Sequence, residues 1–401
     1  MTNQSQSRSE RDHLLFLDGL RGLAALYVVV HHALLQVIFT YPPSMLPYRF
    51  TVTTNWLLYG QMSVSIFIVL SGFCLMLPVA RGDGHLRGGF GQFIKRRAWR
   101  ILPPYYAAVV LSLILIRTMP FLEHSKNGLW RQALPAFAPG VLVSHLLLYH
   151  NWSKEWLLKI DYPLWSVATE WQIYIVFGLL LLPMWRRFGL IWTIAGAFAL
   201  AYLPDFIFHH RITTEGLHLL VLFAFGMCSA VIAVSKDVRR KIIEKRALIG
   251  SLCAVGLLFT PIVARRHPEM LSHVFSYHDI PVGIATAVLL PVLMLAPRYR
   301  AANFAAMIVR ILECRPLVVL GTFSYSLYLI HAPILAIVFY YFYSMHISAI
   351  PCFVACEFIG VLICLCCSYI FHLIFERPFM SKPSPKTERQ VELAAIVSPA
   401  P

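Results

Sequence analysis

Two ionisable side chains, Arg21 and His32, stand eleven residues apart in the first long apolar segment of the chain. On an α-helix this separation is about 20° past three full turns, so both side chains share a face, about 16 Å apart along the axis. A guanidinium binds phosphates, and an imidazole can act as a general base or a nucleophile. Alternatively, Arg21 merely pairs with Asp18 and His32 is a hydrogen-bonded interior histidine. We expect the Asp18–Arg21 pair in either case and favour a functional role for His32, with His31 turned about 80° away from Arg21.

Two further polar side chains, Glu170 and His331, lie at a similar depth in later apolar segments. A carboxylate in such a place must be neutral, paired or solvated by a cavity. Ser166, Glu170 and Tyr174 are four residues apart and share a helix face, and a partnership between Glu170 and a histidine is geometrically possible. Because ionisable groups inside a membrane are functional candidates by default, we predict catalytic or orienting roles for His32, Glu170 and His331.

Cationic and small residues occupy two more places where a ligand could bind. Arg97 and Arg100 belong to a cationic cluster over residues 95–100, and their spacing of three presents a two-pronged face suited to phosphates. Charges that only set membrane topology explain the cluster equally well. Ser71 and Gly72 could line a narrow channel for the ligand, although close helix packing is the favoured interpretation. No cysteine or histidine spacing typical of a metal site is present, so we predict no metal.

The composition of the chain requires lipid as its solvent. Of the 401 residues 58% are hydrophobic and only 13% are charged, and the mean hydropathy is +0.67. Soluble proteins carry roughly 25% charged residues, about twice this share. The net charge of +15 sits in short loops between apolar runs, where it orients the chain in the membrane. The hydropathy therefore excludes a soluble protein and a nucleic-acid-binding protein.

We predict an all-α polytopic membrane protein with about ten transmembrane helices. The apolar runs cover residues 14–40, 55–80, 101–120, 163–184, 189–207, 216–235, 247–264, 279–297, 316–342 and 349–375. With the N-terminus inside, 24 of the 34 lysines and arginines fall in cytoplasmic segments and 9 in outer ones, so both termini are predicted to be cytoplasmic.

The elements between and beyond these spans complete the predicted organisation. Residues 299–315 read as an amphipathic helix on the membrane surface, and the run 137–150 is too short to cross. We expect a disordered cytoplasmic tail over 1–13, one transmembrane domain over 14–380 and a second disordered tail over 381–401, with no further domain appended.

In order and spacing these residues resemble the membrane-bound acyltransferase family 3, the bacterial O-acyltransferases of polysaccharides, lipooligosaccharides and secondary metabolites. The matching motifs run from about residue 14 to 380: Leu17-Asp18-Gly19-Leu20-Arg21-Gly22-Leu23-Ala24-Ala25, the Arg-x10-His spacing that selects His32, the glycine and serine residues of the second span, Arg97-x-x-Arg100 before Pro103-Pro104-Tyr105, Trp165-Ser166 with Glu170, Ser324-Tyr325-Ser326 with Tyr328 and His331, and Glu376-Arg377-Pro378. Each motif alone is weakly specific, whereas their order in a ten-span setting is specific.

The resemblance implies acyl transfer, most often of acetyl, from cytoplasmic acyl-CoA to a hydroxyl of a cell-envelope or exported glycan or a lipid-linked saccharide. The location implied is the bacterial inner (plasma) membrane. His32 would then be the catalytic histidine, with Arg21, Arg97 and Arg100 on the donor side and no tightly bound cofactor. Two departures from the family pattern are the doubled histidine, which makes a role for His31 conceivable, and Trp171 in the place of a second Glu.

Two other classes of protein are compatible with buried ionisable residues. A transporter of a polar solute or a proton also keeps Arg, His and Glu residues inside its spans, but it often shows repeats with broken helices, which this sequence lacks. A membrane-embedded interaction subunit would use the same residues only for helix contacts. The acceptor site, if there is one, is expected in the outer segment 121–162, which contains His145 and His150.

Overall fold

The computed structural model describes residues 3–207, 216–235, 279–296 and 304–380, which form helices and no strands. Within this part of the chain six helical segments are long and apolar enough to cross a membrane: Leu15–Ile38, Tyr48–Arg81, Gly89–Thr118, Leu164–Phe188, Ser324–Ser344 and Ala349–Phe379. Helices satisfy their own backbone hydrogen bonds, which lipid cannot do for them. The predicted all-α class is therefore confirmed for the described residues.

Each spanning segment is a single helix or a run of helices. The principal helices are α1 (Asn3–Ile38), α3 (Gln61–Arg81), α4 (Gly89–Thr118), α7 (Leu164–Val176) with η5 (Phe177–Leu181) and α8 (Leu182–Phe188), α16 (Ser324–Ser344), and α17 (Ala349–Ala355) with η7 (Cys356–Gly360), α18 (Val361–Phe371) and η8 (His372–Glu376). Shorter helices are α2 (Tyr48–Thr54), α5 (Pro120–Glu123), α6 (Pro139–Leu146), α9 (Leu190–Ile207), α10 (Leu219–Val234), α13 (Asp279–Leu295), α14 (Phe304–Leu312) and α15 (Arg315–Thr322).

Most of the predicted spans coincide with these helices. The runs 189–207, 216–235 and 279–297 correspond to α9, α10 and α13, which are shorter than the six long segments. The predicted span 247–264 and the tail 381–401 lie outside the described residues. The count of ten spans, the side on which both termini lie and the domain boundaries therefore stay predictions.

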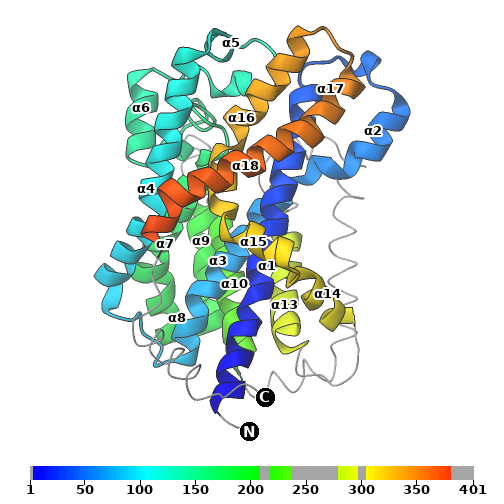
Figure 1. Cartoon of the computed structure of the whole chain (residues 1–401). Coiled ribbons are helices and arrows are strands. Elements are labelled where there is room, and N and C mark those ends of the chain that lie inside the picture. The colour runs from blue at the N-terminus through cyan, green and yellow to red at the C-terminus, as the bar shows by residue number, and fades with distance from the viewer. Residues whose placement is uncertain (1–2, 208–215, 236–278, 297–303, 381–401) are drawn as a thin grey trace.

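The central helix α1 packs against α3, α14, α15 and α16 (Figure 1). A Cβ atom on Gly22 would lie 2.6 Å from the carbonyl oxygen of Leu317, and one on Gly321 would lie 2.0 Å from that of Asp18. Glycine on both helices thus lets α1 and α15 touch backbone to backbone. This contact fixes the rotation of α1 and, with it, the direction of the Asp18 and Arg21 side chains.

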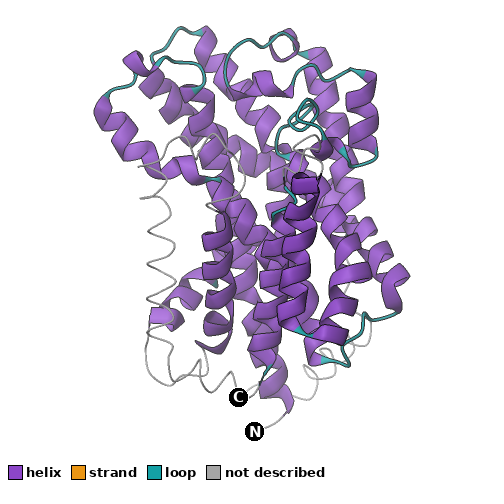
Figure 2. Ribbon diagram, turned by 180° about the vertical axis from the view of Figure 1, so that it is seen from behind, coloured by secondary structure: helices purple, strands orange, loops and turns teal. Residues whose placement is uncertain are grey.

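Short helices and loops of residues 119–163, which we call the outer cap, cover one end of the bundle. The cap contains α5 and α6, and teal loops join its helices in the reverse view (Figures 1 and 2). Trp130 and Tyr162 of the cap pack with Ala332 and Ala336 of α16 in a hydrophobic cluster of their own. The cap is thereby anchored on the same helix that carries His331.

Candidate active site

A cavity of 420 Å³ lies between α1, α3, α4, α7 and α16. We call the part lined by Arg21, Arg97 and Arg100 the cationic end, and the part lined by Val64, Phe67, Ile68, Val167 and Tyr328 the apolar end. Its polar lining also includes Asp18, Ser71, Cys74, Ser166, Glu170, Tyr174, Ser324 and Tyr325. The described helices therefore surround a partly open space with charge at one end.

The three predicted donor-side arginines all line this cavity. Arg21 donates from Nη1 to Asp18 Oδ1 at 3.1 Å, and its Nη2 lies 3.1 Å from the Sγ of Cys74. Arg97 and Arg100 face the cavity from one turn of α4, and the buried Nε of Arg97 has no hydrogen-bond partner among the described residues. The expected Asp18–Arg21 pair is thus confirmed, and the guanidinium groups of Arg97 and Arg100 face the same space, which suits a ligand with several negative charges.

Glu170 lies with the cationic end and not with a histidine. Its Oε1 accepts hydrogen bonds from Ser71 Oγ at 2.5 Å and from the Tyr174 hydroxyl. The shared face of Ser166, Glu170 and Tyr174 is confirmed, since all three line the cavity. The rotation of α7 turns this face towards Ser71 of α3, so the structure does not bring about the Glu170–histidine partnership that the sequence allows.

The histidine that partners His32 is His331. The Nδ1 of His32 lies 2.7 Å from the Nε2 of His331, and the two rings lie edge to edge and nearly coplanar, with their centroids 5.0 Å apart and 13° between their planes. The Nδ1 of His331 faces the carbonyl oxygens of Leu327 at 3.0 Å and Tyr328 at 2.9 Å. Because a carbonyl can only accept, the proton of a neutral His331 sits on its Nδ1, and its Nε2 accepts from His32.

This chain of hydrogen bonds leaves the Nε2 of His32 with its lone pair, the form that a general base or a nucleophile requires. The neighbouring His31 is oriented differently: its Nδ1 donates to the carbonyl oxygen of Leu57 at 2.6 Å, and its ring packs against Gly60. Tyr162 of the outer cap packs edge-on against His32, at 4.9 Å between ring centroids. The two adjacent histidines therefore have different hydrogen-bond partners: His32 bonds to His331, whereas His31 bonds to Leu57.

Gly72 does not line the cavity, whereas its neighbour Ser71 does. A Cβ atom on Gly72 would lie 2.2 Å from the carbonyl oxygen of Phe223, so Gly72 serves the close contact between α3 and α10. Its predicted role in binding the donor is corrected to one in helix packing. Of the two roles that the sequence left open, Ser71 therefore lines the cavity and Gly72 allows close helix packing.

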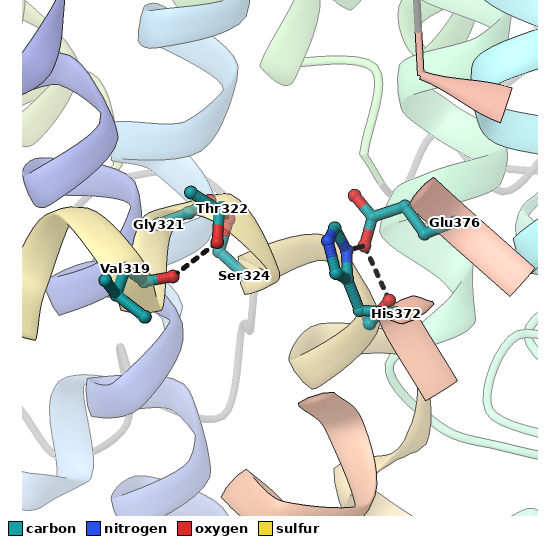
Figure 3. A network of polar contacts seen from close by, with 7 residues as sticks. Val319, Gly321, Thr322, Ser324, His372 and Glu376 are labelled. Atoms are coloured by element: carbon teal, nitrogen blue, oxygen red, sulfur yellow. Dashed lines mark hydrogen bonds and ion pairs between the residues drawn. The ribbon is translucent and has the colours of Figure 1, made fainter. Parts of the chain in front are cut away.

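A buried acid at the end of η8 anchors the C-terminal helix. Glu376 accepts hydrogen bonds from Ser326 Oγ at 2.5 Å and from His372 Nδ1 at 2.8 Å, the latter shown in Figure 3 beside Ser324. Trp99 of the cationic cluster packs on Phe379, just beyond this acid. The motif that begins at Glu376 therefore ties α18 to α16 and to the start of α4.

The two histidines of the outer cap are buried and stacked on each other. The rings of His145 and His150 are parallel to within 6° and 3.8 Å apart, and His145 Nδ1 donates to the carbonyl oxygen of Val141. Burial lowers the pKa of His145 to about 4 and lowers that of His150 well below its usual value. Both rings are thus neutral supports of the cap and present no open surface to an acceptor.

Sequence reasoning assigned no role to three residues that shape the site. Cys74 contacts Arg21, and Phe67 and Tyr328 pack together where the cavity ends below His331. Cys74 is one turn beyond Ser71 and Tyr328 one turn before His331, so helical spacing could have pointed to both. Phe67 carried no such signal, because an apolar residue in an apolar helix is indistinguishable from core.

The fold and this site define a polytopic α-helical membrane protein whose buried ionisable residues surround an internal cavity. Residues 14–372 match the family model described as an acyltransferase domain. The chain belongs to this acyltransferase family, as its motifs predict, because the match covers nearly its whole length. The family assignment gives no support to the transporter alternative.

Three curated relatives illustrate the likeness. The peptidoglycan O-acetyltransferase OatA of Listeria monocytogenes is 25% identical over 352 residues, which cover 82% of this chain and 51% of the relative. The O-acetyltransferase OatA of Staphylococcus aureus is 25% identical over 91% of this chain and 57% of its own. The putative peptidoglycan O-acetyltransferase YrhL of Bacillus subtilis is 24% identical over 80% of this chain and 48% of its own. The chain spans about half the length of these relatives, and no solved structure matches it.

Proposed function

We propose that the protein transfers an acyl group from a cytoplasmic acyl-CoA to a hydroxyl of a glycan outside the membrane. The observation that carries this proposal is the pair His32–His331, which leaves the Nε2 of His32 unprotonated near a cavity with a cationic end. A base beside a phosphate-binding cavity suits a donor that joins a thioester to anionic phosphates. Membership of the acyltransferase family supports the same reaction class.

The donor would enter with its phosphates at the cationic end of the cavity. Arg21, Arg97 and Arg100 present guanidinium groups to one space, and charge-assisted hydrogen bonds to phosphate are among the stronger ones in proteins. The rise along α1 from Arg21 to His32 is about 16 Å, a length that an extended pantetheine arm can cover. The arm would thus lie along α1 and carry its thioester towards His32.

At His32 the acceptor hydroxyl attacks the thioester carbonyl. The Nε2 of His32 takes the hydroxyl proton, the new C–O bond forms, the C–S bond breaks, and the proton passes to the departing thiolate. In a second version Nε2 itself attacks the thioester carbonyl, and the C–S bond breaks to release the CoA thiolate. The acceptor hydroxyl then attacks the acyl-histidine, the C–N bond breaks, and the hydroxyl proton passes to the thiolate. His331 plays the same part in both versions, since it holds the His32 proton on Nδ1.

For the acyl group and the acceptor we propose acetyl and a cell-envelope glycan such as peptidoglycan. The support is the names of the relatives from Listeria monocytogenes and Bacillus subtilis, which specify peptidoglycan O-acetylation. The outer cap contacts His32 through the ring of Tyr162, which packs edge-on against the His32 ring. An acceptor that arrives from that side would therefore meet the base without entering the donor cavity.

The proposal is tested by following the label of radiolabelled acetyl-CoA into envelope glycans in isolated membranes. We expect His32→Ala to abolish the transfer that the wild-type protein supports. His31→Ala is the matched control, because His31 donates to the carbonyl oxygen of Leu57, whereas His32 bonds to His331. Full transfer by a folded His32→Ala protein would exclude His32 as the catalytic residue. Absence of both transfer and acyl-CoA binding in the wild type would exclude the proposed donor.

A further inference from the structure

The cavity changes character along α3. Val64, Phe67, Ile68, Ser71 and Cys74 recur at helical spacing along its lining, and Leu75 ends the row. From Val64 to Leu75 the helix rises about 16 Å. The part near Ser71 and Cys74 is polar, since these residues contact Glu170 and Arg21, whereas the outer part is the apolar end.

The apolar end stops one aromatic layer short of the histidine pair. The ring centroid of Phe67 lies 6.2 Å from that of Tyr328, and the Tyr328 centroid lies 5.9 Å from that of His331, which is hydrogen-bonded to His32. Among the described residues that line the cavity neither histidine is found, whereas Phe67 and Tyr328 both are. A thioester in the cavity therefore meets these two rings before it meets His32.

The Tyr328 ring is held in place by its hydroxyl group. This hydroxyl donates to the carbonyl oxygen of Pro163 at 3.1 Å and lies 2.7 Å from the Oγ of Ser166. The Ser166 hydroxyl also donates to the carbonyl oxygen of Pro163, at 3.2 Å, so either hydroxyl can be the donor in the bond between Ser166 and Tyr328. Two hydrogen bonds to the start of α7 thus hold the Tyr328 ring across the end of the cavity. Phe67 packs against this ring through its own ring alone.

We propose that Phe67 and Tyr328 are specificity-determining residues that together form a gate between the donor cavity and His32. The gate has two effects. The Phe67 ring bounds the apolar end so that a short acyl group fits beside it and a longer one does not. The Tyr328 ring keeps water in the cavity away from His32 until the thioester displaces the ring. This inference rests on the proposed acyl-CoA reaction.

The second effect has a measurable counterpart in hydrolysis. When the gate is open, water takes the place of the acceptor: His32 accepts a proton from water, the water oxygen bonds to the acyl carbon, and the C–S bond breaks. The proton then passes to the thiolate, so each acyl-CoA and water yield one carboxylic acid and one free CoA thiol. An intact gate therefore suppresses thiol release in the absence of an acceptor.

The test uses the purified full-length protein with acetyl-CoA and hexanoyl-CoA, with and without an acceptor glycan. We expect Phe67→Ala to raise the ratio of hexanoyl to acetyl transfer about tenfold or more, because a removed ring leaves space for extra methylene groups. We expect Tyr328→Phe, which loses both hydrogen bonds, to raise acceptor-independent thiol release while the chain-length ratio stays low. Both are compared with the wild type at equal amounts of folded protein.

Matched controls separate the gate from general loosening. Tyr105→Phe is the control for Tyr328→Phe, because it also removes a buried hydroxyl that donates to a carbonyl oxygen, here that of His145. Phe198→Ala is the control for Phe67→Ala, because it removes an aromatic ring on α9. Neither Tyr105 nor Phe198 lines the cavity. Neither control should change the ratio or the thiol release. If Phe67→Ala does not fold, Phe67→Leu should give a smaller shift in the same direction. A folded Phe67 variant with the wild-type chain-length ratio, or a folded Tyr328→Phe protein with wild-type thiol release, would overturn the gate. A wild type that transfers nothing would instead overturn the proposed function.

Discussion

His32 acquires a defined protonation state from a second histidine, where a carboxylate would be the commoner partner. The carbonyl oxygens of Leu327 and Tyr328 fix the proton on the Nδ1 of His331, and this leaves Nε2 free to accept from His32. Both rings can remain neutral in this arrangement, so no isolated charge has to be buried in the bundle. The pair therefore orients a base at low electrostatic cost.

The first prediction concerns this orienting role. We expect His331→Ala to lower kcat about a hundredfold or more, because the proton of His32 is no longer held on Nδ1. The KM for acyl-CoA should not change, since His331 does not line the cavity. His331→Gln, whose amide oxygen can accept from His32, should recover part of the rate. Steady-state kinetics of the wild type, His331→Ala and His331→Gln give kcat and KM for each protein. A wild-type kcat in folded His331→Ala would rule out the orienting role.

The second prediction concerns the guanidinium groups of the cavity. We expect Arg97→Gln and Arg100→Gln each to raise the KM for acyl-CoA about tenfold, because each removes one charge-assisted hydrogen bond to the donor. The kcat should change little. Arg96→Gln is the matched control, because Arg96 donates to the carbonyl oxygen of Arg87 and does not line the cavity. If all three variants give the same KM, the phosphates bind elsewhere.

At the scale of elements, the third prediction concerns the contact between α3 and α10. A methyl group at Gly72 would lie 2.2 Å from the carbonyl oxygen of Phe223, so Gly72→Ala should destabilise the protein by about 1–3 kcal/mol. Gly91→Ala on α4, where a Cβ atom meets nothing within 4 Å, should be neutral or slightly stabilising. Thermal unfolding in detergent measures both, and equal melting temperatures would show that the two helices can move apart.

The fourth prediction concerns the outer cap, where Asp161 is fully buried. Its Oδ2 accepts from Ser112 Oγ at 3.0 Å, its Oδ1 has no partner among the described residues, and burial raises the pKa of its carboxyl group well above the usual value. The folded protein then keeps a proton that the unfolded chain releases above about pH 4. The free energy of unfolding therefore falls as the pH rises above about 4.

We accordingly expect the melting temperature of Asp161→Asn to exceed that of the wild type by more at pH 8 than at pH 4. The asparagine oxygen can still accept from Ser112, and the variant has no carboxyl group to ionise. Asp83→Asn, at an exposed aspartate, serves as the control and should show no such growing difference. A difference for Asp161→Asn that shrinks as the pH rises would show that the folded state prefers the ionised carboxylate.

The sequence predicted helices and their faces better than the contacts between them. Helical arithmetic predicted a shared face for Arg97 and Arg100 and an inward face for Arg21, because both depend on a single helix, and all three arginines line the cavity. The partners of Glu170 and His32 depend on how α7 and α16 are rotated against their neighbours. Those rotations come from backbone contacts such as the one at Gly22, which no pattern within one helix reveals.

At the scale of the whole molecule, the cavity has a direction. Its cationic end contains Arg97 and Arg100, and these belong to the segment that the bias of lysine and arginine assigns to the cytoplasm. The outer cap with Tyr162 stands on the other side of His32. Donor and acceptor would thus approach the same imidazole from opposite faces of the membrane, so that no acyl-CoA has to leave the cell.

The fifth prediction follows from this sidedness. Inverted membrane vesicles, which expose the cytoplasmic face, should bind and consume added acetyl-CoA, whereas right-side-out vesicles should not. Acetyl-CoA does not cross a bilayer unaided, because its phosphates carry charge that lipid cannot solvate. Mild permeabilisation of the right-side-out vesicles should restore consumption and serves as the control for intact protein. Consumption by intact right-side-out vesicles and not by inverted ones would place the cationic end on the outer face and reverse the predicted topology.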